Sequence, residues 1–204
     1  IFRESLYLFY IHEICGLKLK QILIGGDVLT SGLVREVLGE NPKNKEIEIY
    51  NMYGPTECCI DVLKYKIDKK EEMRLTIPIG RPKSNIKIYI LKGNNCIVPI
   101  GMNGEICVSG ICLARGYMNR EELTKERFVE NPFLKGERLY RTGDIGRWLD
   151  DGNIEFLGRK DEQIKVRGFR IELGEIESAL SKHPLIRENT VLAKKLKGEE
   201  KELI

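Results

Sequence analysis

The chain has 204 residues, of which 42% are hydrophobic and 32% charged, and its formal net charge is +3. These fractions are typical of a globular protein with a buried core and exclude a disordered or fibrous chain. The sequence contains no block of Lys and Arg interleaved with aromatic residues, so nucleic acid is not an expected partner. No apolar run has the ~20 residues that cross a bilayer, and there is no signal-peptide pattern, so we expect no membrane and a cytoplasmic location.

The cysteines and histidines offer little metal or nucleophile chemistry. None of the six cysteines forms a Cys-x-x-Cys pair, and none stands with histidine at zinc-ligand spacing. We therefore expect reduced thiols of a cytosolic protein. Because the chain begins with Ile1, directly in an apolar segment, we also expect it to be a piece of a longer protein.

The first third of the chain predicts a parallel α/β unit. Residues 2–15 allow a helix, and residues 19–24 end in Gly25-Gly26, as a short buried strand would. Thr30 and Ser31 can cap a helix that Gly39 ends, because apolar positions recur between them at helical spacing.

Residues 46–50 then predict the next strand of this unit. A strand, a helix and a strand in this order imply a right-handed parallel unit. Ligands bind beyond the carboxyl ends of strands in such sheets. We therefore expect Gly25 and the loop after Tyr50 to be neighbours at a site.

The middle of the chain predicts an antiparallel sheet. From about residue 77, apolar and polar residues alternate over residues 86–90, a turn that contains Gly and Asn follows, and residues 105–109 come after a further Asn-Gly turn. A helical turn is expected at residues 124–128 and a hairpin turn at residues 150–153. These short strands imply a small β-rich domain.

The last part predicts the opening of a separate domain. A Gly168-Phe169 turn separates two short segments within residues 163–171, and residues 174–183 place apolar side chains on one helical face. Residues 189–193 resemble a strand. These elements look like the start of an α/β domain.

Two polar clusters are candidates for binding. The loop Asn51-Met-Tyr-Gly-Pro-Thr-Glu57 offers an amide, a ring, a hydroxyl and a carboxylate, which can contact a base, bind a phosphate oxygen and hold a hard cation. An ordinary Gly-Pro turn with a Thr cap explains the same residues. The run from Tyr140 to Glu177 frames polar residues with Gly at both ends of a hairpin, which is typical of ligand binding beside a flexible joint.

Four segments together resemble successive core motifs of adenylate-forming enzymes, and most closely the amino-acid adenylation domain of nonribosomal peptide synthetases. The segments are residues 51–57, residues 104–110 with Gly116-Tyr117, residues 140–144 and residues 158–172. The resemblance extends from about Leu19 to Ala193. It implies an α/β chain with three parts: the C-terminal part of a large α/β subdomain with a nucleotide loop (1–76), a β-barrel-like subdomain (77–158), and a hinge with the start of an α+β C-terminal domain (159–204).

The resemblance also implies roles for the residues of the loop and the hairpin. Asn51 and Tyr53 would contact adenine, and Thr56 would contact the ATP phosphates. Glu57 would hold Mg²⁺, so that Thr56 and Glu57 would be the catalytic residues. The carboxylate of Asp144 would accept hydrogen bonds from both ribose hydroxyls, which suits an ionised acceptor.

Three further roles follow from the same resemblance. Arg159 would contact the ribose from its far side. Asp161 would be the hinge about which the C-terminal domain turns between adenylating and thiolating poses. Residues around Gly168 would face the phosphopantetheine of a peptidyl carrier protein, which is the implied partner.

The amino-acid pocket is assigned by position alone. Its candidates are Leu23, Gly25, Met52, Ile60 and Asp61. Leu23 and Ile60 would equally fit a plain core. The Leu, Met and Ile side chains favour an apolar substrate, and Asp61 does not fit that preference.

The family's phosphate loop and its amino-group-anchoring aspartate would lie before Ile1, and its near-terminal lysine would lie after Ile204. Because such preorganised charges contribute several kcal/mol to catalysis, we expect this piece alone to form no adenylates. Two other functions stay open: an acyl-CoA or aryl-acid ligase of the same superfamily, and a non-catalytic module that binds nucleotide or carrier protein. A purely structural role is a further alternative.

Overall fold

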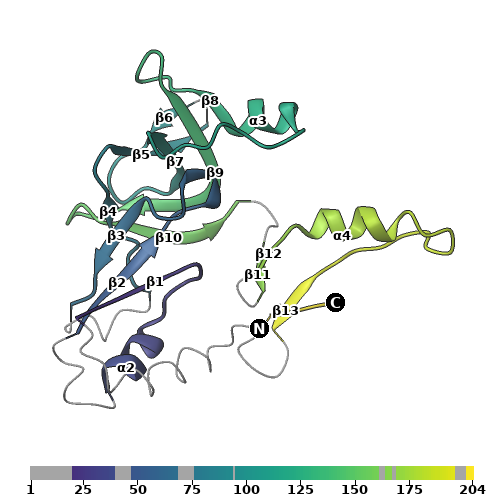
Figure 1. Cartoon of the computed structure of the whole chain (residues 1–204). Helices are drawn as coiled ribbons and strands as arrows, with labels where there is room; N and C mark the ends of the chain where they lie inside the picture. The colour runs from purple at the N-terminus through teal and green to yellow at the C-terminus, as the bar shows by residue number, and fades with distance from the viewer. Residues whose placement is uncertain are drawn as a thin grey trace. The chain divides into compact units, whose positions relative to one another are not determined.

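The chain forms two compact units, Leu17–Lys160 and Asp161–Ile204, the second together with Ile1–Gly16. Figure 1 shows the computed structural model, which describes residues 20–39, 47–68, 76–93, 95–160, 164–166, 169–195 and 201–204. The helix expected at residues 2–15 lies outside the described residues. No helix among them is long and apolar enough to cross a bilayer.

The first unit begins with the predicted parallel pair of strands. Strand β1 (Gln21–Gly25) pairs with β2 (Glu48–Tyr53), and helix α2 (Ser31–Gly39) lies between them in sequence. The side-chain Oγ1 of Thr30 accepts a hydrogen bond from the N–H of Leu33 at 3.3 Å, which confirms the predicted cap. Since Gly25 lies opposite a residue of β2, the ends of both strands are neighbours, as predicted.

Two expectations about these strands are wrong in detail. In β1 only Ile24 is buried, and Leu23 is 58% exposed, because β1 is the outer strand of the described part of its sheet, which has the order β1-β2-β3-β4. Strand β2 does not end at Tyr50 but continues to Tyr53. It does so because β3 (Leu63–Lys66) pairs with its second edge and supplies partners for its backbone groups.

The second sheet of this unit contains the antiparallel strands that the sequence predicts. Its order is β10-β9-β7-β5-β6, with β8 paired to β9. The short β4 (Arg81–Pro82) pairs with β3 in the first sheet. The strands of the second sheet are β5 (Ile86–Lys92), β6 (Cys96–Ile97), β7 (Gly104–Gly110), β8 (Phe128–Glu130), β9 (Arg138–Trp148) and β10 (Ile154–Arg159).

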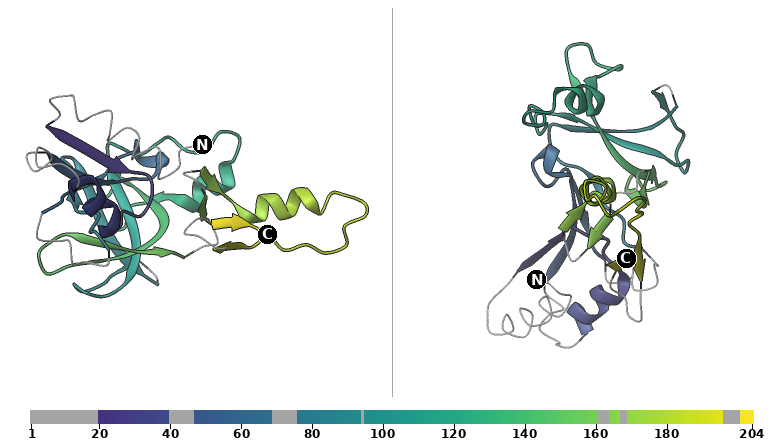
Figure 2. Two further views of the ribbon diagram at one scale, coloured as in Figure 1. Left: turned by 90° about the horizontal axis from the view of Figure 1, so that it is seen from below. Right: turned by 90° about the vertical axis from the view of Figure 1, so that its right-hand side faces the viewer.

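The connections within this sheet agree with the turn signals. The hairpin between β9 and β10 has its turn at the expected residues, where Gly152 has a φ of 76°. Helix α3 (Glu121–Arg127) precedes β8 and begins earlier than the single helical turn that we expected at residues 124–128. Helix α3 contacts β8, and Figure 2 shows the chain from two further sides.

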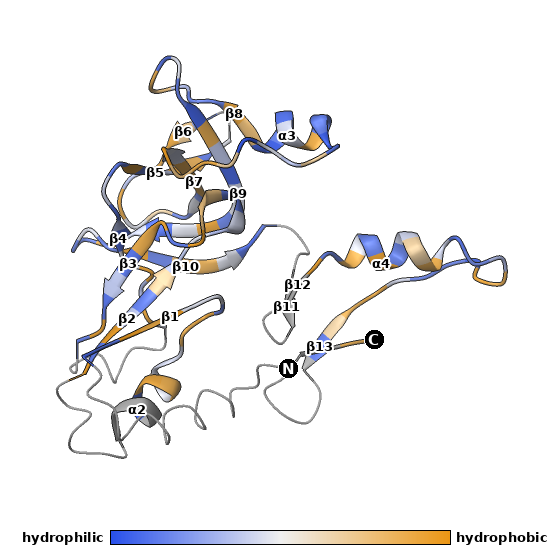
Figure 3. Cartoon of the chain, viewed as in Figure 1, coloured by the Kyte–Doolittle hydropathy of each residue, from blue (hydrophilic) through white to orange (hydrophobic). Residues whose placement is uncertain are grey.

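One hydrophobic core connects the two sheets of the first unit. In Figure 3, apolar and polar residues alternate along the strands around it, which is the pattern of strands with one buried face. Burying a side chain such as Leu63 or Ile106 stabilises a fold by roughly 2 kcal/mol. The core consists of Cys58, Val62, Leu63, Ile79, Ile88, Ile90, Val98, Ile106, Val108, Cys112, Phe128, Tyr140 and Ile154.

The second unit contains two hairpins and a helix among its described residues. The strands β11 (Ile164–Val166) and β12 (Phe169–Ile171) form the first hairpin, and helix α4 (Leu173–Leu180) follows it. The second hairpin joins β13 (Ala193–Lys195) and β14 (Lys201–Leu203). The strand expected at residues 189–193 is therefore wrong in its extent.

The early part of that segment has other hydrogen-bond partners. Asn189 donates from Nδ2 to the hydroxyl of Ser181 at 2.8 Å, and the N–H of Val191 donates to Glu177 Oε1 at 2.9 Å. These bonds attach the segment to α4 and to the turn that follows it. A strand needs backbone partners at regular spacing, and these begin only near Ala193.

The described cysteines fall into a buried and an exposed group. Cys58, Cys107 and Cys112 are buried, whereas Cys59 and Cys96 are exposed. Burial raises the pKa of the Cys58 thiol, and it raises the pKa of Cys107 to about 12. Because the thiolate is the nucleophile, these buried thiols should be unreactive.

We therefore expect iodoacetamide to alkylate Cys59 and Cys96 in the folded protein. Cys58, Cys107 and Cys112 should be alkylated only after unfolding in denaturant. Peptide mass spectrometry after brief labelling measures both states. Labelling of Cys107 in the folded protein as fast as that of Cys96 would contradict the burial described above.

Candidate functional site

Asp144 lies at a bulge in the long strand β9. The register between β7 and β9 shifts there, so that residues 142–144 lie opposite a single residue of β7, Ile106. Gly143 accommodates the bulge with a φ of 76°. The Thr142 hydroxyl donates to the Ile106 carbonyl at 2.6 Å and accepts from the Asp144 N–H at 2.9 Å. The backbone that carries Asp144 is therefore fixed from within the strand.

Glu105 on β7 holds the same bulge from the neighbouring strand. Its Oε1 accepts from the N–H of Gly143 at 3.2 Å, and its Oε2 accepts from Nη2 of Arg141 at 2.9 Å. The hydrogen bond with Glu105 raises the pKa of Arg141. A charge-assisted contact to a backbone N–H is stronger than a neutral one, so Glu105 stabilises an otherwise irregular backbone.

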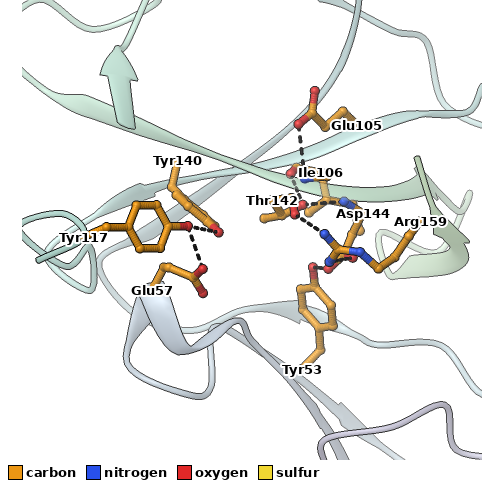
Figure 4. Close-up of polar contacts among 10 residues, drawn as sticks. Tyr53, Glu57, Glu105, Ile106, Tyr117, Tyr140, Thr142, Asp144 and Arg159 are labelled. Atoms are coloured by element: carbon orange, nitrogen blue, oxygen red, sulfur yellow. Dashed lines mark hydrogen bonds and ion pairs between the residues drawn. The ribbon is translucent and has the colours of Figure 1, made fainter. Parts of the chain in front are cut away.

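The Asp144 carboxylate is bound on both of its oxygens. Arg159 lies directly opposite Asp144 across β9 and β10, and its Nη1 donates to Oδ1 at 2.7 Å. Its Nη2 also donates to the carbonyl of Thr142 at 3.2 Å. From the first sheet, the Tyr53 hydroxyl donates to Asp144 Oδ2, as Figure 4 shows. Residues from β2, β9 and β10 thus converge on one carboxylate.

The electrostatics of this group keep the carboxylate as an acceptor. Burial, followed by the charge of Asp144, raises the pKa of Tyr53 well above its ordinary value, so its hydroxyl stays protonated and donates. Asp144 is 7% exposed and is paired with the Arg159 guanidinium. An ionised and oriented carboxylate of this kind can accept short hydrogen bonds from the hydroxyls of a ligand.

Glu57 is the centre of a second polar cluster. It lies on a 3₁₀ helix, Thr56–Cys58, and is 6% exposed. Its Oε1 accepts from the Tyr117 hydroxyl at 2.7 Å, and that hydroxyl lies 3.2 Å from the hydroxyl of Tyr140. Burial, and then the hydrogen bond with Tyr117, raise the pKa of Tyr140, which keeps its hydroxyl neutral.

The loop that carries Glu57 is tightly folded. A Cβ atom at Gly54 would lie 2.1 Å from the carbonyl oxygen of Ile60, so the backbone approaches itself where only Gly fits. Cys59 and Ile60 both have positive φ values, of 56° and 74°. The N–H of Val62 closes the loop by donating to the Tyr53 carbonyl at 2.8 Å. This is more than an ordinary Gly-Pro turn.

Two other residues of the predicted nucleotide loop have different environments. Thr56 is exposed, so its hydroxyl can reach a ligand. Asn51 is 2% exposed, and its Nδ2 donates to the carbonyl of Pro78 at 2.9 Å. The Asn51 side chain therefore links β2, by a hydrogen bond, to the segment that precedes β4.

The candidates for the amino-acid pocket are only partly close together. Gly25 and Met52 lie opposite each other on β1 and β2. Leu23 and Ile60 have exposed side chains. The Asp61 carboxylate lies 3.8 Å from Nζ of Lys83, as part of an ion pair. The hinge candidate, Asp161, lies outside the described residues.

The donor atoms near Glu57 fit a hard cation. Glu57 provides a carboxylate and Thr56 provides a hydroxyl, both of which are oxygen ligands. Over the described part of the chain, no group of three or more His, Cys, Asp or Glu residues could hold a metal ion by itself. One carboxylate combined with ligand phosphates and water is a donor set that suits Mg²⁺.

Sequence reasoning missed the residues that support these two carboxylates. Tyr117 and Tyr140 occur in the quoted motifs, but no role was assigned to them, because they reach Glu57 only through the fold. Glu105 gave a usable signal, since it is a charged residue directly before an uncharged run, residues 106–110. Buried acids are rare unless they are paired.

Thr142 provides a direct test of the bulge. Replacing Thr142 by Val keeps the shape of the side chain and leaves the Ile106 carbonyl and the Asp144 N–H without this partner. We expect the free energy of unfolding to fall by about 1 to 2 kcal/mol. Urea unfolding followed by fluorescence measures it. Thr142→Ser, which keeps the hydroxyl, should lower the free energy of unfolding less than Thr142→Val does. Equal decreases would mean that the hydrogen bonds of the hydroxyl do not cause the destabilisation.

Comparison with known proteins identifies the family. Residues 10–118, more than half of the chain, match the AMP-binding enzyme family. Bacitracin synthase 1 of Bacillus licheniformis is 48% identical over 177 residues, which are 86% of this chain and 3% of that protein. Surfactin synthase subunit 2 of Bacillus subtilis (strain 168) is 49% identical over 185 residues, which are 91% of this chain and 5% of that protein.

A solved structure agrees with these relatives. The chain resembles holo-PA1221, described as an NRPS protein containing adenylation and PCP domains, with a TM-score of 0.85 and 31% identity. The match covers 98% of this chain and 35% of that one. The chain therefore spans a small part of the curated relatives and about a third of this structural relative. It belongs to the AMP-binding enzyme family and, within it, to the adenylation domains of nonribosomal peptide synthetases.

Proposed function

We propose that this chain supplies the nucleotide-holding part of an enzyme that activates an amino acid with ATP. The amino-acid carboxylate attacks the α-phosphorus of ATP, an acyl–phosphate bond forms, and the bond to the β-phosphate breaks with release of pyrophosphate. The thiol of a phosphopantetheine then attacks the acyl carbon, forming a thioester and releasing AMP. The observation that carries the proposal is the Asp144 carboxylate between Arg159 and Tyr53.

The Asp144 group would bind the nucleoside. Its carboxylate accepts both ribose hydroxyls, Arg159 contacts the ribose from the far side, and Tyr53 packs against adenine. The low exposure of Asp144 supports this role, because a charge-assisted hydrogen bond is stronger where water is excluded. Asn51 contributes to the adenine site, and its bond to the Pro78 carbonyl indicates that it also shapes the backbone there.

The Glu57 group would bind the phosphates. Thr56 contacts a phosphate oxygen with its exposed hydroxyl, and Glu57 is a ligand of Mg²⁺. When bound, the cation neutralises charge on the phosphates and favours departure of pyrophosphate. The contribution of the protein is to present the two oxygen donors on one short helix.

The amino acid and the carrier protein complete the proposal. Met52 and Gly25, which lie opposite each other, would line the amino-acid pocket together with Leu23, Ile60 and Asp61. Asp161 would be the hinge. Since the similar structures contain PCP domains, we propose a peptidyl carrier protein as the partner of this chain as well.

Pyrophosphate exchange tests the reaction. The full synthetase that carries this chain should incorporate labelled pyrophosphate into ATP only when an amino acid is present. A panel of the standard amino acids, with fatty and aryl acids as the comparison, identifies the substrate. Exchange that requires a fatty or aryl acid, and that no amino acid supports, would contradict the proposal in favour of an acyl or aryl ligase.

A further inference from the structure

The hydroxyl of Tyr117 is the feature of the site that has no role so far. It donates to Glu57 Oε1 at 2.7 Å and lies 3.2 Å from the Tyr140 hydroxyl. Figure 4 shows the hydroxyls of both tyrosines beside the Glu57 carboxylate, with Tyr117 bonded to it. We propose that Tyr117 is a positioning residue that fixes the Glu57 carboxylate for Mg²⁺ and ATP, an inference that rests on the proposed role of Glu57.

Aromatic packing holds the Tyr117 ring. The ring meets Phe128 edge-on, with centroids 5.7 Å apart and an interplanar angle of 67°. Phe128 packs in turn on Tyr140 with centroids 4.8 Å apart. Such pairs contribute beyond their buried area and restrict ring orientation. The hydroxyl of Tyr117 is thus aimed by its surroundings rather than by the bond to Glu57 alone.

The backbone around Tyr117 is connected to the same place. The Tyr117 N–H donates to Thr124 Oγ1 at 2.9 Å, and that hydroxyl donates to the Arg120 carbonyl at 2.8 Å. The N–H of Ala114 donates to the backbone carbonyl of Glu57 at 2.8 Å. The segment before α3 therefore contacts both the backbone and the side chain of Glu57.

The consequence for binding is preorganisation. A Glu side chain has several rotatable bonds, and fixing them when a ligand arrives costs conformational entropy. A hydrogen bond that orients the carboxylate beforehand reduces that cost. Removing the outer partner of a metal ligand typically weakens metal affinity by about 10- to 100-fold. A Phe at position 117 would keep the ring packing and lose only the hydroxyl.

The test compares ATP binding with and without Mg²⁺. Calorimetric titration of the full synthetase with ATP, in MgCl₂ or in EDTA, gives the factor by which Mg²⁺ tightens binding. We expect Tyr117→Phe to reduce this factor about tenfold or more and to leave the affinity in EDTA unchanged. Tyr89→Phe is the matched control, because the Tyr89 ring stacks on Phe133 on another part of the same sheet.

The possible outcomes are distinct. If Mg²⁺ tightens ATP binding to the Tyr117→Phe protein as much as it does for wild type, this inference is overturned and the proposed function stays intact. Wild-type protein that binds no ATP in either buffer would contradict the proposed function and, with it, this inference. A double-mutant comparison covers the case in which a variant folds poorly. In a Glu57→Gln background, Tyr117→Phe should cause no further loss of the factor by which Mg²⁺ tightens ATP binding. A further loss would also overturn the inference.

Discussion

Replacing Asp144 by alanine is expected to lower the free energy of unfolding by about 3 to 5 kcal/mol, because Arg159 loses its partner in a largely buried ion pair. The Tyr53 hydroxyl loses its acceptor in the same variant. If Asp144 binds the ribose as proposed, the affinity for ATP should fall by about 100-fold, since two charge-assisted hydrogen bonds to the ligand would be lost. Denaturant unfolding and calorimetric titration with ATP measure the two effects.

The same pair of strands provides a matched control. Arg147 on β9 and Glu155 on β10 form a second ion pair, 2.8 Å long, with more exposed side chains. We expect Glu155→Ala to cost at most about 1 kcal/mol and to leave ATP affinity unchanged, because exposed pairs contribute little. Similar effects of the two substitutions on ATP affinity would show that Asp144 has no special role in binding.

The second large effect is expected at Gly54. A Cβ atom there would lie 2.1 Å from the Ile60 carbonyl oxygen and 2.9 Å from the Cα of Asp61, and both are backbone atoms that cannot turn away. Gly54→Ala should therefore cost about 3 kcal/mol or more, which is the upper range for overpacking. It should also displace Glu57 and lower ATP affinity. Thermal unfolding and titration with ATP measure these losses.

Gly32→Ala is the control for Gly54. Gly32 lies in helix α2, where a Cβ atom would meet only Thr30 Oγ1, at an ordinary distance of 3.7 Å. Because Ala is the better helix former, this substitution should stabilise the protein by up to about 1 kcal/mol. If Gly54→Ala proved as harmless as Gly32→Ala, the close approach described for the loop would be wrong.

Local patterns predict much of this fold. Alternation of apolar and polar residues predicted β5, and turn residues with known φ preferences predicted β7 and the hairpin between β9 and β10. Capping chemistry located the start of α2 at Thr30. The patterns failed where strand pairing decides the outcome. The additional length of β2, up to Tyr53, depends on β3, and the exposure of Leu23 depends on the place of β1 as the outer strand of the described part of its sheet.

The candidate site shows the same division. The motif resemblance selected Asp144, Arg159, Tyr53 and Glu57, and the structure places the first three in one hydrogen-bonded group. Their nucleotide roles remain predictions. The sequence did not show that residues 142–144 form a bulge, because a bulge is defined by two strands together. For the same reason, the contact between Tyr117 and Glu57 was not predictable from spacing.

The end of β10 has a mechanical consequence. Arg159 is its last residue, and the N–H of the following Lys160 donates to the Gly143 carbonyl at 2.8 Å. The division between the two units of the chain comes directly afterwards, at Asp161. The end of β10, next to the proposed hinge, is therefore held to β9 by both a side chain and the backbone. If Asp161 is the hinge proposed above, this anchoring would preserve the geometry of the Asp144 group when the chain turns there.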